Sequence, residues 1–262
     1  MSRTENLLDI QSLTVDVSLT GQSIVRNLNV AVKPESILAL VGGSGSGKTT
    51  TGMAILGLLP EALHVKGGQI FFQGQNLMTF NHRQMRTVRG KDMGMVFQEP
   101  LWAFNPVFTV GQQLKEVLDV HTHLSGREKR EKVIAVLEKV EIPDPLRIAR
   151  SYPHQLSGGL RQRAMIAQAI IAGPKLLIAD EPTSNLDVTV QARIIALFKK
   201  LKDELKLSIL LITHDLGMVR FLADEVAVMH EGTVVESGIT QDVWRSVRHP
   251  YTAQLMKALD VE

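Results

Sequence analysis

The chain has 262 residues, of which 44% are hydrophobic and 21% charged, and its net charge at pH 7 is +2. These values suit one large globular domain with a subdomain, and the near-neutral charge gives no strong attraction to nucleic acid or anionic lipid. The absence of cysteine excludes disulfides, cysteine zinc sites and iron–sulfur clusters. We expect no signal peptide and no membrane-spanning helix, since no segment approaches the roughly 20 apolar residues that a bilayer requires.

Alternating or continuous apolar residues predict four strands in the first third of the chain, at residues 7–17, 24–32, 37–41 and 69–74. The run 37–41, ILALV, is apolar throughout, which is typical of a parallel strand buried on both faces. A glycine-rich loop follows at once. Residues 48–59 then predict a helix that ends at Pro60.

Strand signals vanish between about residue 100 and residue 165, where 126–142 has helical spacing with a charged face. This change predicts an inserted helical subdomain, and the basic run 127–132 is interpreted as a solvated helix face. The rest of the chain alternates predicted helices (161–172, 188–205, 216–222, 239–247) with predicted strands (175–179, 208–212, 225–229, 233–237). Such alternation predicts an α/β fold whose mainly parallel sheet is covered on both faces.

The glycine-rich loop, GGSGSGKT, matches the phosphate-loop (Walker A) pattern GxxxxGK[ST]. Glycines permit close approach of the backbone, so that successive N–H groups and the helix N-terminus can face phosphates. Lys48 is expected to contact the β- and γ-phosphates, and the Thr49 hydroxyl to bind Mg2+. The alternative is a flexible glycine–serine turn, which the position between a buried strand and a helix disfavours. The expected nucleotide contacts are Gly42, Gly43, Ser44, Gly45, Ser46, Gly47, Lys48, Thr49 and Thr50.

A second motif places two acids at the end of an apolar strand, LLIADE, residues 176–181. The carboxyl end of a buried parallel strand faces the crevice where ligands bind in open α/β sheets. Asp180 is then expected to hold the Mg2+ shell, and Glu181 to orient or deprotonate the attacking water. The alternative is a plain acidic turn before Pro182.

The run Ser157-Gly158-Gly159 precedes a predicted helix and lies 23 residues before Asp180. It forms a second helix N-terminus suited to an anion. A single chain does not need two such sites for one γ-phosphate, so we expect this one to serve a nucleotide held by a partner subunit. Ordinary N-capping by Ser157 is the alternative.

Three further polar residues follow strand-like or acidic segments. Gln98 is a candidate sensor of Mg2+ or the attacking water, His214 a candidate hydrogen-bond partner of the γ-phosphate, and Asp187 a candidate contact across a subunit interface. Gln98 and His214 can equally be plain strand-end polar residues. His121 and His123 lie two positions apart without an accompanying acidic cluster, which argues against a metal site.

Together these elements resemble the ABC ATPase family over nearly the whole chain. The resemblance implies a P-loop NTPase (RecA-like) core with a mainly parallel sheet, an N-terminal antiparallel β subdomain and an inserted α-helical subdomain. The nucleotide-binding core would comprise 1–98 and 165–262, and the helical signature subdomain 99–164. The resemblance also implies ATP and Mg2+ as ligands, and a head-to-tail dimer that holds two ATP molecules between Lys48 of one subunit and residues 157–159 of the other.

The resemblance further implies an ATPase on the cytoplasmic face of the inner membrane, peripheral to transmembrane permease subunits. Its second ATPase subunit is either identical or a sister chain, an extracytoplasmic solute-binding protein acts indirectly, and nucleic acid is not a partner. The alternative is a soluble ABC-type ATPase not coupled to transport. Such proteins usually carry two cassettes or a long coiled coil, and neither is present in this sequence.

A narrower resemblance comes from residues 98–114, from SYPHQLSGG at 151–159 and from HPYT at 249–252. These segments look like the oligopeptide, dipeptide and nickel importer branch. The segments VGGSGSGK and LGLLP, together with the absence of a cysteine-bearing C-terminal extension, slightly favour the nickel-type subunits over the peptide type.

Four aromatic residues, Phe97, Trp102, Phe104 and Phe108, crowd into 12 positions, although the chain has only 12 aromatic residues. We expect them to form an apolar docking surface for a permease helix; the alternative is the core of the helical subdomain.

Two positions depart from the family pattern. No Phe, Tyr or Trp precedes Phe71, so the aromatic residue that usually stacks on adenine is missing, and Leu19 or a neighbour takes its place. Leu160 stands where the family commonly has glutamine, so anion binding there must rest on the main-chain N–H groups and Ser157. We expect weaker base discrimination and weaker ATP binding from the first departure.

Overall fold

The computed structural model describes residues 6–257 and divides the chain into two compact units. The first unit joins the residues up to 85 with those from 206 onward, and the second unit holds residues 86–205. Within residues 6–257, no helix combines the length and the apolar character that crossing a membrane requires.

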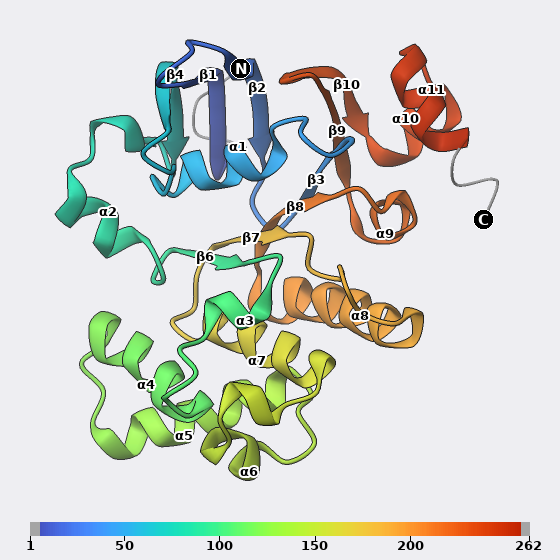
Figure 1. Ribbon diagram of the computed structural model, residues 1–262. Helices are drawn as coiled ribbons and strands as arrows, with labels where there is room; N and C mark the ends of the chain where they lie inside the picture. The colour runs from blue at the N-terminus through green and yellow to red at the C-terminus, as the bar shows by residue number, and fades with distance from the viewer. Residues whose placement is uncertain (1–5, 258–262) are drawn as a thin grey trace. The chain divides into compact units, whose positions relative to one another are not determined.

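The first unit contains an antiparallel sheet in the order β2-β1-β4-β5 (Figure 1). Its strands are β1 (Leu8–Val17), β2 (Ser23–Val32), β4 (Leu63–Phe72) and β5 (Gln75–Asn76). The predicted strands 7–17 and 24–32 are confirmed. Of the predicted strand 69–74, residues 69–72 form the end of the longer β4, and residues 73–74 form a turn. Gly68 lies in the middle of β4 at φ +98°, and a Cβ there would lie 2.5 Å from the main-chain oxygen of Ser12. Gly68 therefore marks a close approach of β4 to β1.

The same unit holds the strands β3 (Ile37–Val41), β8 (Ser208–Thr213), β9 (Glu225–His230) and β10 (Thr233–Ile239). β3 lies between β8 and β9 and pairs with both in parallel, and β10 pairs with β9 in antiparallel fashion. All five residues of β3 are buried, as the continuous apolar run predicts. The helices are α1 (Lys48–Ile55), α9 (Leu216–Leu222), α10 (Thr240–Arg245) and α11 (Pro250–Lys257). Figure 1 shows α1 beside β2, with which it is in contact.

Helix α1 ends at Ile55, earlier than the predicted end before Pro60. Gly57 has φ +60° and its N–H donates to Ala54 O, while the N–H of Leu58 donates to Met53 O. This pair of bonds is the Schellman arrangement, which satisfies the last carbonyl groups of a helix and stops it. Gly57, not the later proline, therefore sets the boundary.

The second unit contains one parallel strand pair, β6 (Met93–Val96) and β7 (Leu176–Asp180), and most of the helices. Helix α2 (His82–Val88) crosses the boundary between the units. The short helices η1 (Leu77–Thr79) and η2 (Pro153–Gln155) belong to the first and second units respectively. The remaining helices are α3 (Pro100–Ala103), α4 (Val110–His121), α5 (Gly126–Lys139), α6 (Pro145–Arg150), α7 (Gly158–Ile170) and α8 (Val188–Leu205).

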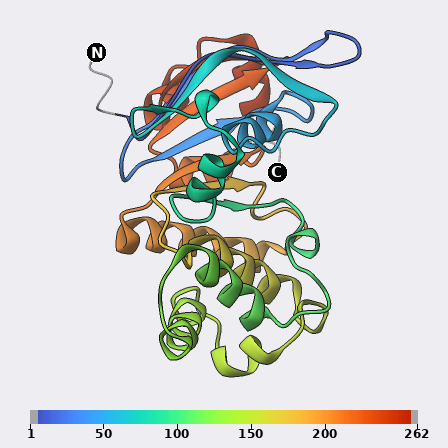
Figure 2. The same ribbon diagram turned by 90° about the vertical axis from the view of Figure 1, so that its left-hand side faces the viewer.

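Helices α4, α5 and α6 pack against one another, and α3, α4 and α5 contact α7; Figure 2 shows these green to yellow helices gathered together. The helices expected between about residues 100 and 165 are present. The division of the chain observed here falls near residues 85 and 205. The boundaries 99 and 164 of a helical signature subdomain stay a prediction.

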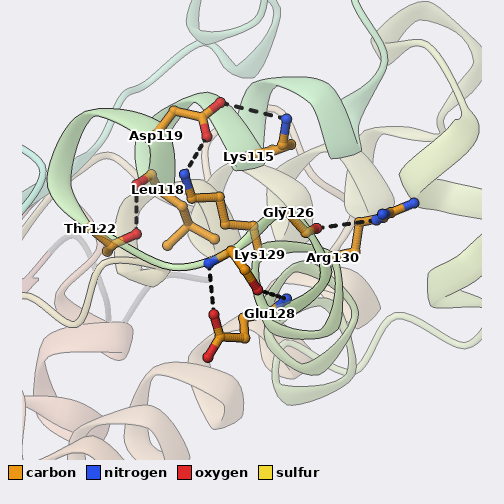
Figure 3. A network of polar contacts seen from close by, with 9 residues as sticks. Lys115, Leu118, Asp119, Thr122, Gly126, Glu128, Lys129 and Arg130 are labelled. Carbon is orange, nitrogen blue, oxygen red and sulfur yellow. Dashed lines mark hydrogen bonds and ion pairs between the residues drawn. The ribbon is translucent and has the colours of Figure 1, made fainter.

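Polar contacts fix the turn between α4 and α5 (Figure 3). The Ser125 N–H donates to Glu128 Oε2 at 2.7 Å and the Glu128 N–H donates to Ser125 Oγ at 3.3 Å, which is a capping box at the start of α5. Asp119 of α4 accepts from Lys129 of α5 at 2.7 Å, and Lys115 lies 3.8 Å from the same carboxylate. The hydrogen bond from Lys129 is the main cause that lowers the pKa of Asp119 below its ordinary value.

Candidate functional site

The phosphate-loop residues lie between the buried strand β3 and the first turn of α1. Gly47 is the residue before α1 and has φ +101°, and Gly45 has φ +75°. A Cβ on Gly42 would lie 2.1 Å from the main-chain oxygen of Met229. These positions require glycine for conformation or for space, so a random glycine–serine turn does not describe the loop. Its N–H groups precede a helix N-terminus, which is the geometry that binds phosphate.

Lys48 is the buried cation of this loop, with 7% of its surface exposed. Its Nζ donates to the main-chain oxygens of Gly42 at 2.8 Å and Gly43 at 2.9 Å. A buried ammonium group must be compensated, and these main-chain oxygens contribute to that compensation. A glycine-rich loop with a lysine at a helix N-terminus is suited to an anionic group. Thr49 and Thr50 follow in the first turn of α1, and both are half-buried.

His214, also in the first unit, directly follows β8 and is exposed. The next residue, Asp215, caps α9 by accepting from the Met218 N–H at 2.9 Å. The strand is one residue longer than predicted, and His214 stands just beyond its carboxyl end. Its proposed contact with a γ-phosphate stays a prediction.

In the second unit, Asp180 is the last residue of β7 and is only 2% exposed. Strand β7 runs from 176 to 180 and not from 175 to 179, so the buried acid lies on the strand itself. Glu181 follows in the left-handed region with φ +47°, and its main-chain oxygen accepts from the N–H and the hydroxyl of Ser184 at 3.1 and 2.9 Å. A non-glycine residue in this region carries strain, which the turn bonds offset. The two acids thus have different surroundings, one buried and one half-buried at a turn.

Ser157 is the N-cap of α7, and its Oγ accepts from the Leu160 N–H at 3.4 Å. The helix begins at Gly158, three residues before the predicted start at 161, so both glycines belong to its first turn. Ser157 and Gly158 are exposed. A Cβ on Gly159 would lie 2.9 Å from Val190 of α8, so the bare glycine lets the two helices approach closely. The capping alternative for Ser157 is therefore observed, and it leaves main-chain N–H groups of the first turn at an exposed helix end.

Asp187 has a structural role that the sequence reasoning missed. Its Oδ1 accepts from the Val190 N–H at 2.9 Å, which caps the start of α8. An Asp directly before a long amphipathic helix is the sequence signal for such an N-cap. A second missed pair joins two loops of the same unit: Asn185 Nδ2 donates to Glu99 Oε1 at 3.0 Å, and the Ser184 hydroxyl donates to Gln98 O at 3.4 Å. Gln98 itself lies two residues after β6 and is exposed.

The predicted residues fall into two groups that the chain keeps in separate units. The first unit carries the phosphate loop and His214. The second carries Gln98, residues 157–159, the acids 180–181 and Asp187. Within the second unit, residues 157–159 and 186–190 lie side by side, because a Cβ on Gly158 or Gly159 would contact Leu186 or Val190.

The four aromatic residues expected to form a docking surface differ in their exposure. Phe104 is buried with 4% exposed, so it belongs to the core of the second unit, whereas Phe108 is 46% exposed beside Val107 at 69%. Phe97 is half-buried, and the side chain of Trp102 lies outside the described residues. The four aromatic residues therefore do not form one exposed surface, because Phe104 is taken up by packing.

Comparisons with known proteins agree with these features. A sequence profile of the ABC transporter family matches residues 25–184. The oligopeptide transport ATP-binding protein OppD of Bacillus subtilis is 42% identical over 262 residues, which cover 99% of this chain and 73% of that protein. A Brucella abortus protein named as a peptide import ATP-binding protein is 44% identical over 259 residues, 98% of this chain and 78% of that protein.

Two solved structures are similar over most of the chain. The cbiO1 protein of Clostridium perfringens, described as part of the ABC transporter complex cbiONQ, has a TM-score of 0.81 at 27% identity and covers 97% of this chain and 99% of its own. A dimeric, post-hydrolysis ATP-binding cassette bound to ADP and Pi has a TM-score of 0.79 at 26% identity, covering 89% and 98% respectively.

Proposed function

Since the chain belongs to the ABC transporter family, we propose that it is the ATP-hydrolysing subunit of a membrane importer. Its fold is the P-loop NTPase fold of ABC ATPase cassettes, with both a parallel and an antiparallel sheet. The observation that carries the proposal is the buried ammonium of Lys48 inside a loop whose glycines are required by conformation and space. That arrangement suits a nucleotide phosphate.

The residues present have chemistry that fits ATP with Mg2+. Main-chain N–H groups at the start of α1 and the Lys48 ammonium would bind the β- and γ-phosphates. Hard cations prefer oxygen ligands, and the Thr49 hydroxyl, the buried Asp180 carboxylate and the Gln98 amide would supply them, directly or through water. When bound, the ion would neutralise charge that develops on the transferring phosphoryl group.

Glu181 would accept the proton of the attacking water, and His214 would hydrogen-bond the γ-phosphate. Glu181 is suited to this role because it is half-buried, so water can reach it, while the turn bonds on its main chain hold its position. Asp180, in contrast, is nearly inaccessible and is better suited to hold a cation shell than to exchange protons.

A head-to-tail dimer would complete each ATP site. The N-terminal turn of α7 is exposed at Ser157 and Gly158, which leaves it available to a partner's nucleotide. Asp187 neighbours this turn through the contacts of residues 186–190, so we infer that it lies at the same subunit interface. The similar cassette bound to ADP and Pi is itself dimeric.

We further propose that the subunit works at the cytoplasmic face of the inner membrane with transmembrane permease subunits, and indirectly with an extracytoplasmic solute-binding protein. The exposed Val107 and Phe108 are candidate contacts for a permease. The substrate class that the named relatives favour is peptides. Those relatives give no support to the sequence-based preference for nickel, so uptake of nickel or another metal chelate is the second candidate.

The first test is nucleotide binding by the isolated chain. Lys48→Ala removes the ammonium and should weaken ADP and ATP binding strongly, since a charge-assisted contact is worth about 1.5–3 kcal/mol, or roughly 10- to 150-fold in Kd. Binding is measured by titration of a fluorescent ADP analogue. A wild-type chain that binds no adenine nucleotide, or a variant that binds as the wild type does, contradicts the proposal.

A second test separates the importer from the soluble alternative. A soluble ATPase would hydrolyse ATP at its full rate without permease subunits, whereas reconstituted permease should stimulate ATP hydrolysis by an importer subunit.

A further inference from the structure

The segment HPYT, residues 249–252, has a structural role beyond marking a family branch. It opens helix α11, and the hydroxyl of Tyr251 accepts a hydrogen bond from the Gly43 N–H at 2.8 Å. Gly43 is the second glycine of the phosphate loop and lies 208 residues away in sequence. Both residues belong to the first unit. A side chain near the end of the described chain thus holds a main-chain amide of the nucleotide loop.

The position of Tyr251 is fixed by contacts on several sides. Its ring stacks on His230, with ring centroids 3.8 Å apart and an interplanar angle of 25°. Its N–H donates to His249 Nδ1 at 3.2 Å. The Glu236 carboxylate accepts from the N–H groups of Arg248 at 2.9 Å and His249 at 3.1 Å, which anchors the start of α11 to β10. The hydroxyl is therefore presented to Gly43 by a rigid support.

The same part of the fold supports the phosphate loop at a second point. The Gly232 N–H, in the turn between β9 and β10, donates to Ser46 O at 3.2 Å. The main-chain oxygen of Met229 occupies the space next to Gly42, where a Cβ would lie 2.1 Å from it. Strand β9, its turn and α11 thus contact the loop at its beginning and near its end.

We propose that Tyr251 is a positioning residue for the phosphate loop: its hydroxyl holds the Gly43 N–H and fixes the loop in the conformation that receives the nucleotide phosphates. This inference rests on the proposed ATP site. The physical reason is pre-organisation. Gly42, Gly43 and Gly45 give the loop more conformational freedom than other residues would, and binding must remove that freedom. A hydrogen bond already made in the free protein lowers this entropic cost and raises affinity without touching the ligand.

The test is the variant Tyr251→Phe, which removes the hydroxyl and keeps the ring on His230. We expect ADP binding to weaken about fivefold, the factor to which the mean net strength of one hydrogen bond corresponds. ADP is the probe because it can bind one chain without a partner subunit. The matched control is Tyr152→Phe, since Tyr152 is the other tyrosine of the chain, lies in the second unit and stacks on His154 at 5.6 Å. This control should bind ADP as the wild type does.

Two further readouts separate positioning from general support of the fold. In steady-state hydrolysis, Tyr251→Phe should raise KM for ATP and leave kcat nearly unchanged, because the hydroxyl touches no reacting atom. In amide hydrogen exchange of the wild type, the Gly43 N–H should be protected, and the variant should lose that protection while thermal unfolding stays close to that of Tyr152→Phe.

Three results would overturn the inference: ADP affinity of Tyr251→Phe equal to that of the wild type, a fall in kcat at constant KM, or fast exchange of the Gly43 N–H in the wild type. The last measurement needs no variant, so a variant that does not fold leaves the inference testable. A wild-type chain that binds no ADP contradicts the proposed function instead, whereas normal wild-type binding with an unaffected variant contradicts only the role of Tyr251.

Discussion

Substitutions at two glycines of the phosphate loop can separate the energetic cost of a steric clash from the cost of a left-handed backbone conformation. Gly47 and Gly45 both have positive φ, +101° and +75°. A Cβ on Gly47 would lie 2.9 Å from the main-chain oxygen of Ile24 and 2.8 Å from Met229 Cε, whereas a Cβ on Gly45 would have nothing within 4 Å. Alanine at either position therefore costs conformational energy, but only Gly47→Ala adds a clash.

The expected magnitudes follow from this difference. A left-handed conformation costs an L-residue about 1–2 kcal/mol, which is the whole expected loss of unfolding free energy for Gly45→Ala. Overpacking against a fixed carbonyl adds about 1–3 kcal/mol, so Gly47→Ala should lose about 2–5 kcal/mol. At roughly 2–4 °C per kcal/mol for chains of this size, the two variants should differ in Tm by several degrees.

The assay is equilibrium urea unfolding of both variants and the wild type, with ADP binding measured in parallel. Gly47→Ala should also weaken ADP binding more than Gly45→Ala, because its clash displaces the residue that begins α1. If the two variants lose the same stability, or if Gly45→Ala loses more, the close approach of Ile24 and Met229 to the loop does not govern its tolerance.

Two remaining predictions concern base preference and acid stability. The chain lacks an aromatic residue before Phe71, and Leu19 is 93% exposed, so a stacking contact worth about 1–3 kcal/mol on the base is missing. ATP and GTP should therefore be hydrolysed at comparable kcat/KM. Tight binding with a strong preference for ATP would contradict this prediction. The pKa of Asp119 is lowered, chiefly by the hydrogen bond from Lys129, so its stabilising contribution is present above the unfolded pKa of about 3.9 and is lost as the pH falls through the lower folded value. Urea unfolding across this range should show a smaller loss for Asp119→Asn than for the wild type, and identical acid profiles would refute the assignment.

Features with short-range causes were predictable from the sequence. The buried strand 37–41 is apolar at every position, and the phosphate loop that follows has fixed spacing, so its location before α1 followed directly. The acids 180–181 were expected at a strand end because a buried strand does not tolerate a charge in its middle. Asp180 is nevertheless on the strand and almost fully buried, which shows that one residue of register decides whether an acid is inside or outside.

Features that depend on distant backbone could not be predicted in the same way. The sequence predicts a strand only from residue 69, but β4 begins at Leu63 and runs through Gly67 and Gly68; at Gly68 the main chain of β1 approaches too closely for a Cβ. Gly57, in the left-handed region, ends α1 before Pro60, where the sequence predicts its end. The bond from Gly43 to Tyr251 joins residues 208 positions apart, and no local pattern around either residue signals it. Phe104 was misassigned because local crowding of aromatic residues does not tell which of them packing will bury.

We propose that ATP joins this cassette to a second one, either identical or a sister chain, around residues 157–159. For two identical copies, the most direct measurement is the association state of Glu181→Gln with ATP. This variant should bind ATP without hydrolysing it, and sedimentation should show an ATP-dependent dimer that ADP does not produce. Adding Gly158→Asp should abolish the dimer, because a carboxylate at this exposed helix start repels a phosphate. The substitution should not disturb the fold itself. An acid in the first turn stabilises the helix, and a Cβ there would make only an ordinary contact, 3.6 Å from Leu186. A Glu181→Gln chain that stays monomeric with ATP, that hydrolyses ATP at the wild-type rate, or whose dimer survives Gly158→Asp would contradict the account.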